Sequence, residues 1–301
     1  MHRHAMPATA DLATPACTPL TESELVIAAR SLGAAGTGGA RLVAALMDPR
    51  LHGAALAKRI GSEPGIAARV MRVANSAYFG CTGTVATLER AIQVLGVQGI
   101  KGAAAAACMD RMVAGQAAGA GFDAERFRRH CLVTACLGTR LARELAPDQS
   151  EELFMAGLLH DLGIVVQWRL RPKGMQALTQ SLAAGQVPKD SLAHAEAHHA
   201  GATHEHCTAV VLRSWNLPDS LVQGVARHES AALGPRPDLP SLLRCADSLA
   251  AHLGMGLAQE DSEAWPWRQA LADWGLDDAR LQPLQQVALG DAQAMMAALP
   301  D

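Results

Sequence analysis

The sequence predicts an all-α protein, and three observations support this fold class. Apolar residues recur at intervals of three and four along most of the chain, as one face of a helix requires. Glycine and proline interrupt this pattern repeatedly, which divides it into short helices. No stretch shows the sustained two-residue alternation, bounded by hairpin turns, that predicts strands. Hydrophobic residues make up 50% of the 301-residue chain, enough to bury one large core or two smaller ones.

The N-terminal part of the chain is predicted to form a helical lobe over residues 21–121. Residues 1–20 precede it as a flexible tail, because proline, threonine and aspartate interrupt any continuous apolar run there. Gly96 separates one of the helices of this lobe from a long alanine-rich helix that ends near Ala118. Helical spacing of apolar residues predicts shorter helices over residues 21–33, 42–48, 54–60, 64–75 and 88–95.

The second lobe is predicted over residues 122–256, followed by a short helical C-terminal extension over residues 257–301. His130 lies on the apolar face of one helix of this lobe. Asp247 lies among the apolar positions of another helix, which Ser241 is expected to cap. Further helices are predicted over residues 151–163, 178–184, 207–215 and 220–228.

One apolar helical run, residues 153–163, carries His160 directly before Asp161. An imidazole and a carboxylate are costly to bury unless they have partners, so the partners must come from other parts of the chain. The pair suits a metal site, because a neutral imidazole supplies one ligand nitrogen and the carboxylate supplies or bridges a second ligand. The alternative is a hydrogen-bonded pair, or a larger buried polar network, that holds no metal.

Histidines elsewhere in the chain are the candidate partners. His130 taken alone is typical of a hydrogen-bonded core histidine. Five of the twelve histidines lie close together, between His194 and His206. This tract is a metal-binding segment, a solvated turn, or one ligand among bystanders, and we favour the third interpretation.

Charge and cysteine content restrict the class of protein. The net charge is −3 with no block of lysine and arginine, so we expect neither nucleic acid nor an anionic membrane surface as a partner. The most apolar window, residues 91–109, contains glutamine, lysine and glycine, and we therefore expect no membrane-spanning segment. The seven cysteines are scattered without a Cys-x-x-Cys pair, which favours a reducing cytoplasm.

The order of these residues resembles the HD superfamily of metal-dependent phosphohydrolases. That pattern is a histidine, a His-Asp pair and a distant aspartate on separate helices of one bundle, and His130, His160, Asp161 and Asp247 match it in order. Residues 75–80, Asn-Ser-Ala-Tyr-Phe-Gly, and the His-Asp-Leu-Gly segment that begins at His160 further resemble the narrower HDOD family, the HD-related output domain. The resemblance covers roughly residues 40 to 255.

The HDOD resemblance implies a bacterial signal-transduction output or regulatory protein that acts by binding a signalling protein partner. Many members of that family lack metal ligands, but this chain retains those of the HD superfamily, whose resemblance implies a divalent metal, iron, manganese or zinc, in a mononuclear or dinuclear centre. No other cofactor is expected, and no residue is assigned a catalytic role. The metal ligands that the resemblance implies are His130, His160, Asp161, His204, His228 and Asp247.

A metal-dependent phosphohydrolase that acts on a nucleotide, such as a cyclic nucleotide, is the alternative function. Enzymes of that kind carry a lysine where this chain has Ile164, a second histidine where it has Glu229, and a Gly-Tyr-Pro loop that residues 230–240 lack. A dinuclear centre can polarise a phosphate, but hydrolysis also needs the substrate held in line. We therefore expect binding without turnover, and the sequence leaves the question of an enzyme open.

Overall fold

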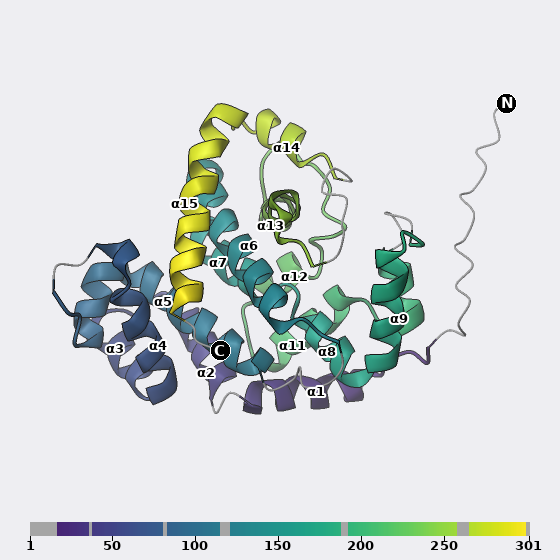
Figure 1. The fold of residues 1–301 in the computed structure, drawn as a ribbon, viewed down its shortest axis with the longest axis horizontal. Helices are drawn as coiled ribbons and strands as arrows, with labels where there is room; N and C mark the ends of the chain where they lie inside the picture. The colour runs from purple at the N-terminus through teal and green to yellow at the C-terminus, as the bar shows by residue number, and fades with distance from the viewer. Residues whose placement is uncertain are drawn as a thin grey trace.

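The computed structural model describes residues 17–35, 38–80, 83–114, 121–187, 192–257 and 265–298, and within these residues every regular element is helical. The predicted all-α fold class is thus confirmed (Figure 1). Most of the tail predicted for residues 1–20 lies outside the described residues. The domain boundaries proposed from the sequence stay a prediction.

Five α-helices and one 3₁₀ turn form the N-terminal region. The alanine-rich middle of α5, residues 103–107, is completely buried, because its small side chains let neighbouring helices pack closely on it. Gly96 has φ 72°, outside the helical region, and breaks α5 where the sequence predicted a division. The elements are α1 (Glu22–Ala35), α2 (Gly39–Leu46), α3 (Gly53–Gly61), α4 (Pro64–Ala74), η1 (Ala77–Phe79) and α5 (Leu88–Ala114).

The second region is a bundle around α6. In Figure 1, α6 and α7 run through the middle of the molecule, α13 lies beside them, and α1 runs along the edge of the bundle under α8 and α11. The elements are α6 (Ala124–Leu145), η2 (Pro147–Gln149), α7 (Ser150–Leu159), α8 (Leu162–Leu170), α9 (Pro172–Ala183), α10 (Leu192–Ala200), α11 (His204–Ser214), α12 (Asp219–Val225), α13 (Leu239–Ala250) and the π-turn η4 (Ala251–Met255).

Two helices follow the bundle, α14 (Trp267–Asp273) and α15 (Asp278–Ala297). The long helix α15 packs along α6 and also reaches α4 and η1, so it contacts both regions of the chain (Figure 1). On α15, Asp291 accepts hydrogen bonds from Tyr78 of η1 and from Arg140 of α6. The expected helical extension is therefore observed in residues 265–298.

The hydrophobic side chains form one large core and one small cluster. The large core contains buried residues from Leu20 to Ala298 and includes all regions of the chain. The small cluster consists of five buried residues on α8, α9 and α10 and lies at one side of the bundle. Its members are Trp168, Met175, Leu178, Ala195 and Ala200.

Two stretches are long and apolar enough to cross a membrane by length and composition, Leu88–Ala114 and Pro147–Leu170. Of their most apolar windows, 56% and 78% respectively is buried inside the protein, as in core helices. The second stretch is not one helix, because it contains η2, α7, a turn and α8. The absence of a membrane-spanning segment stays a prediction.

The start of α13 differs from the prediction. The N-cap is Asp238, three residues before Ser241, and its carboxylate accepts a hydrogen bond from the Ser241 backbone N–H. Ser241 completes a reciprocal capping box, since its hydroxyl accepts from the backbone N–H of Asp238. Leu239 and Pro240 then belong to the first turn, where proline is well tolerated. The helix that carries Asp247 therefore begins earlier than predicted.

Candidate metal centre

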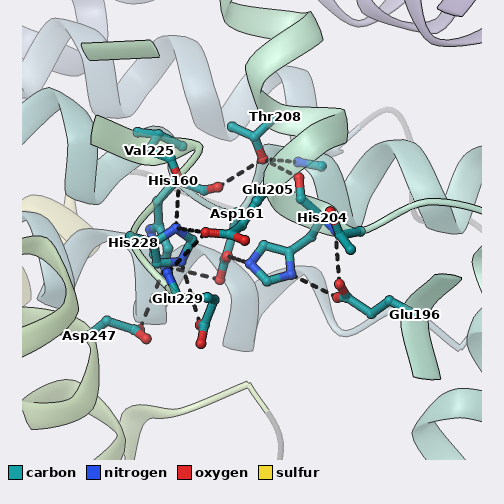
Figure 2. A network of polar contacts seen from close by, with 12 residues as sticks. His160, Asp161, Glu196, His204, Glu205, Thr208, Val225, His228, Glu229 and Asp247 are labelled. Carbon is teal, nitrogen blue, oxygen red and sulfur yellow. Dashed lines mark hydrogen bonds and ion pairs between the residues drawn. The ribbon is translucent and has the colours of Figure 1, made fainter. Parts of the chain in front are cut away.

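Five segments of the second region bring the six predicted ligands together in the interior. One lies on α6, two between α7 and α8, one at the start of α11, one after α12 and one on α13. Figure 2 labels five of them, with the side chains of His204 at the start of α11, His228 after α12 and Asp247 on α13 directed toward the turn of His160 and Asp161. The six residues are His130, His160, Asp161, His204, His228 and Asp247.

His160 and Asp161 do not lie within a helix, contrary to the prediction of a helix over residues 151–163. Helix α7 ends before His160, and α8 begins after Asp161, whose φ and ψ of −103° and 10° are not helical. On a continuous helix, adjacent side chains diverge by about 100° around the axis. The turn removes this divergence, so both side chains reach the same point.

Two glycines allow the helices to approach closely enough for this convergence. A Cβ atom at Gly157 would lie 2.6 Å from the backbone of Ala135 on α6, and one at Gly163 would lie 2.0 Å from the carbonyl oxygen of His204. Any larger residue would push α7 away from α6, or α8 away from α11. These contacts therefore bring the turn against the helices that carry the other ligands.

Thr208 ties α11 to the same turn. Its hydroxyl accepts a hydrogen bond from the Gly163 backbone N–H at 2.8 Å and lies 2.8 Å from the carbonyl oxygens of His160 and His204 (Figure 2). The side chain is fully buried. The hydroxyl therefore satisfies backbone groups at the break between α7 and α8, which would otherwise be buried without partners.

Four ligand atoms converge at what we call the first position, formed by His130, His160, Asp161 and Asp247. The Nε2 atoms of the two histidines are 3.3 Å apart. Asp161 Oδ2 lies 3.3 Å from His130 Nε2 and 3.1 Å from His160 Nε2. Asp247 Oδ1 lies 3.1 Å and 3.6 Å from the same two nitrogens.

The second position is formed by Asp161, His204 and His228. Asp161 Oδ1 lies 3.6 Å from His204 Nε2, so the two oxygens of this carboxylate face the two positions. One ligand atom from each of the three residues falls within 4.8 Å of the others. The Nε2 atoms of His204 and His228 are buried and have no hydrogen-bond partner.

Each of the four histidines is oriented through its Nδ1 atom. His130 donates to the Met255 carbonyl oxygen at 3.1 Å, His160 to Gly157 at 2.9 Å, and His228 to Val225 at 2.7 Å. For His204 the acceptor is the Glu196 carboxylate at 2.8 Å.

Carbonyl and carboxylate oxygens only accept hydrogen bonds, so each of these Nδ1 atoms carries a proton. In the neutral ring, Nε2 therefore keeps its lone pair and points into the centre. This is the tautomer that a metal-binding histidine needs once Nε2 has released its proton, and the Nδ1 hydrogen bonds set it at both positions.

The electrostatic field of the centre favours a cation. Burial by itself would lower the pKa of His160, but the adjacent Asp161 carboxylate outweighs it and raises that pKa to about 10. His130 behaves in the same way, with a pKa well above its usual value. Burial likewise opposes ionisation of Asp161, yet the surrounding histidines hold its pKa well below the usual range. Positive charge, from protons or from metal, is therefore stabilised here.

The ligand atoms fit divalent metal ions. Atoms about 2.0 to 2.2 Å from a common tetrahedral ion are separated from each other by about 3.3 to 3.6 Å. The contacts at the first position, 3.1 to 3.6 Å, match this spacing. Two protonated Nε2 atoms would repel at 3.3 Å, whereas a shared ion satisfies both nitrogens. The unpartnered nitrogens of the second position fit a second ion, and the groups indicate a divalent metal site.

Three glutamates at the centre were not found by sequence reasoning. Glu196 holds both the Nδ1 atom and the backbone N–H of His204. Glu205 accepts from the backbone N–H of Glu229, and Glu229 Oε1 lies 3.6 Å from His228 Nε2 (Figure 2). Glu196 is 3% exposed. For Glu196 and Glu205 the only signal in the sequence is their position within the histidine-rich tract, which does not distinguish them from surface glutamates, and Glu229 is marked only as the residue in place of a second histidine.

Of the histidine-rich tract, only His204 reaches the centre. His194 and His206 are exposed, and His198 is half-buried on α10. The interpretation of one ligand among bystanders agrees with this placement, while the role of each predicted ligand in metal binding stays a prediction.

A cavity of about 200 Å³ opens onto the centre. Its polar wall includes His130, Asp161, His204 and Asp247. Ile164 occupies the position at which phosphohydrolases of this kind carry a lysine, and its side chain forms part of the apolar wall of the cavity.

Solved structures with the same fold include three with substantial coverage. An HDOD domain protein of unknown function from Geobacter sulfurreducens is 16% identical, with a TM-score of 0.69, and the match covers 94% of this chain and 93% of that one. A candidate metal-dependent phosphohydrolase from Shewanella amazonensis is 17% identical, with a TM-score of 0.56 and coverage of 95% and 93%. A candidate signal transduction protein from Marinobacter aquaeolei is 20% identical, with a TM-score of 0.68 and coverage of 86% and 57%.

These identities establish a common fold and no more. No curated protein is a significant sequence relative of this chain. The HDOD domain model matches residues 39–231, more than half of the chain, and this span includes His130, His160, Asp161, His204 and His228 but ends before Asp247. The chain therefore belongs to the HDOD family.

Proposed function

We propose that this HDOD protein is a regulatory component of signal transduction whose centre holds two divalent metal ions bridged by Asp161. In this proposal it acts by binding a protein partner and does not hydrolyse phosphate esters. The observation that carries the proposal is the combination of preset metal ligands with a cavity in whose described lining Arg126 is the single lysine or arginine. The ions that suit its nitrogen and oxygen ligands are iron, manganese and zinc.

The metal part of the proposal is supported by the orientation of the ligands. The histidine Nε2 atoms of both positions point inward with their lone pairs, and the two oxygens of Asp161 face different positions. Bound ions would polarise any oxygen ligand that reaches them. The chain itself contributes the Nδ1 partners, which keep the rings in place whether or not a metal is bound.

Charge argues against phosphate esters as substrates. Among the described residues that line the cavity, Arg126 is the only lysine or arginine, and its Nε atom donates to the Gly256 carbonyl oxygen at 2.7 Å. The five carboxylates in the same lining, Asp123, Asp161, Glu196, Glu229 and Asp247, balance the charge of two divalent ions and of Arg126. Little positive charge therefore remains to hold a phosphate in line.

The regulatory part rests on family membership, on the signalling description of the Marinobacter neighbour and on the position of the centre. Two of the helices around the centre, α6 and α7, also contact α5 of the N-terminal region. Lys101 on α5 pairs with Glu151 on α7 at 2.7 Å, and Asp110 on α5 pairs with Arg128 on α6 at 2.9 Å. Binding of a ligand at the centre that shifts α6 or α7 would therefore also move the contacts between the two regions. This requires that the ligand binds one arrangement of the two regions more tightly than another.

The first experiment measures metal and turnover together. Purified protein is analysed by mass spectrometry for metal content before and after loading with iron, manganese or zinc. The loaded protein is then incubated with cyclic diguanylate, other cyclic nucleotides and guanosine polyphosphates, and the products are followed by chromatography. We expect two ions per chain and no product.

The Asp161→Ala variant is the control for turnover, and exposed Asp148→Ala is its matched surface control. Product formed by the parent and by Asp148→Ala, but not by Asp161→Ala, would make the protein a phosphohydrolase. Failure to take up metal under any loading condition would contradict the metal centre itself.

A further inference from the structure

The cavity at the metal centre has an apolar end that the proposed metal chemistry does not use. We call this end the apolar chamber. It is lined by side chains from α8 and α9 and from the segment before α6, and Trp168, Met175 and Leu178 among them are at least nine-tenths buried. The apolar residues that line the chamber are Phe122, Ile164, Trp168, Met175, Leu178 and Leu182.

The chamber is built separately from the main core. Trp168, Met175 and Leu178 belong to the small cluster, and the Phe122 ring lies 6.1 Å from the Trp168 ring, centroid to centroid. A Cβ atom at Gly174 of α9 would lie 1.8 Å from the His199 carbonyl oxygen of α10, so these two helices are in close backbone contact. The outer wall of the chamber is thus a packed pair of helices with defined side-chain positions.

The size and polarity of the cavity indicate what it can hold. An engineered apolar cavity of about 150 Å³ binds benzene and stays free of water. The cavity here measures about 200 Å³ in total, and the chamber offers water almost no hydrogen-bond partner beyond Thr179. It therefore has room for one ring, or an equivalent branched chain, attached to a small polar group at the metal end.

We propose that the cavity binds a small molecule with two unlike ends. An oxygen-containing head group, such as a carboxylate, ligates the metal at the His130 and Asp247 side. An apolar body about the size of one aromatic ring lies against Trp168, Met175 and Leu178. This inference rests on the proposed metal centre and adds the class of ligand that the centre recognises.

Charge limits the head group to at most one negative charge. With two divalent ions bound, the five carboxylates that line the cavity, Asp123, Asp161, Glu196, Glu229 and Asp247, already balance the ions and Arg126. A phosphate dianion would add unbalanced negative charge inside a cavity whose far wall is apolar, where that charge is poorly screened. A monoanionic head group with an apolar body places its charge at the metal ions and its apolar surface against the apolar wall.

Hydroxamates are suitable probes because their two oxygens ligate metals and their substituent can be varied. Isothermal titration calorimetry on the full, metal-loaded chain compares benzohydroxamate, acetohydroxamate and inorganic phosphate. We expect benzohydroxamate to bind at least about tenfold more tightly than acetohydroxamate, because its ring removes more apolar surface from water. Phosphate should bind more weakly than either hydroxamate.

A lysine at Ile164 tests the location of the apolar body. Ile164 is half-buried and lies where the chamber meets the metal centre. In Ile164→Lys, the ratio of the two hydroxamate affinities should fall toward one and phosphate binding should increase. The matched control is Ile27→Lys, since Ile27 on α1 is 65% exposed and lies outside the cavity lining. Metal content and thermal unfolding are measured for both variants.

The outcomes separate the two proposals. Equal affinities of the two hydroxamates for metal-loaded wild-type protein, or tighter binding of phosphate, would overturn the apolar ligand and leave the metal centre standing. Protein that takes up no metal would overturn both. The wild-type comparison decides the question even if Ile164→Lys does not fold.

Discussion

The two positions of the metal centre are made of similar residues but differ in how they are satisfied. At the first position, Asp161 and Asp247 lie beside both histidine Nε2 atoms, at 3.1 to 3.6 Å. At the second position, the Nε2 atoms of His204 and His228 are buried without a hydrogen-bond partner. The first position can therefore be satisfied by protons alone, whereas the second is left unsatisfied unless a cation or water reaches it.

The comparison shows that two equally buried histidines can differ in which ring nitrogen faces the nearest carboxylate. His130 and His204 are both almost fully buried, and both have a pKa well above the usual value because nearby carboxylates outweigh burial. For His204, however, the carboxylate closest to the ring is Glu196, which lies on the Nδ1 side, away from the centre. We infer that the first position binds its ion more tightly, since it offers four ligand groups and two carboxylates.

Loss of the shared ligand should have the largest effect. Asp161→Asn keeps the shape of the side chain but removes the charge that faces both positions, so we expect the metal content to fall from two ions to none or one. The melting temperature of the loaded protein should drop by about 5 to 10 °C as the binding free energy is lost. Mass spectrometry and calorimetry measure the two effects, with Asp148→Asn on the surface as control. Two ions retained in Asp161→Asn would contradict a shared ligand.

Alanine at one histidine of each position should then separate the two. His160→Ala removes the nitrogen between Asp161 and Asp247 and leaves two buried carboxylates facing each other, which we expect to cost about 3 to 5 kcal/mol of unfolding free energy. His204→Ala should remove one ion and leave the Glu196 carboxylate without its imidazole partner, and we expect it to cost less than His160→Ala, in which two carboxylates lose a shared partner.

Chemical denaturation in chelator and metal analysis check both values. His194→Ala, an exposed histidine of the same tract, is the matched control. Equal losses of unfolding free energy in His160→Ala and His204→Ala would contradict the expected difference between the two positions.

Metal removal should proceed in two stages. Because the first position has more ligand groups, increasing chelator should release the ion of the second position first, with affinities that differ by about tenfold or more. The one-ion form of the wild-type protein should then match His204→Ala in metal content. Release of both ions in a single step, at the same chelator concentration, would show that the two positions do not bind independently.

The smallest expected effect concerns the residue that orients His204. Glu196→Gln removes the carboxylate charge at His204 Nδ1 but keeps an acceptor oxygen, and we expect a loss of about tenfold in affinity for the second ion only. Metal titration followed by calorimetry measures both affinities. Exposed Glu89→Gln is the control. A lower affinity for the first ion as well would show that Glu196 affects both positions.

Sequence periodicity was sufficient for much of the fold. The all-helical class and the break at Gly96 agree with the structure. The reason is that helix formation and burial of an apolar face are read from residues three and four apart. The start of α13 was misplaced because a capping box has two polar residues, and the pattern alone did not show that Asp238 rather than Ser241 is the cap.

The sequence by itself determined which metal-binding residue types are present, and their order along the chain indicated the six candidate ligands through the resemblance to the HD superfamily. Only the tertiary structure decided that His160 and Asp161 occupy a turn, that Asp161 faces two positions, and that Glu196 lies behind His204. It also placed an apolar chamber beside the centre. These features depend on how closely helices distant in sequence approach, at contacts such as Gly157 against α6 and Gly163 against α11, and no local pattern encodes those distances.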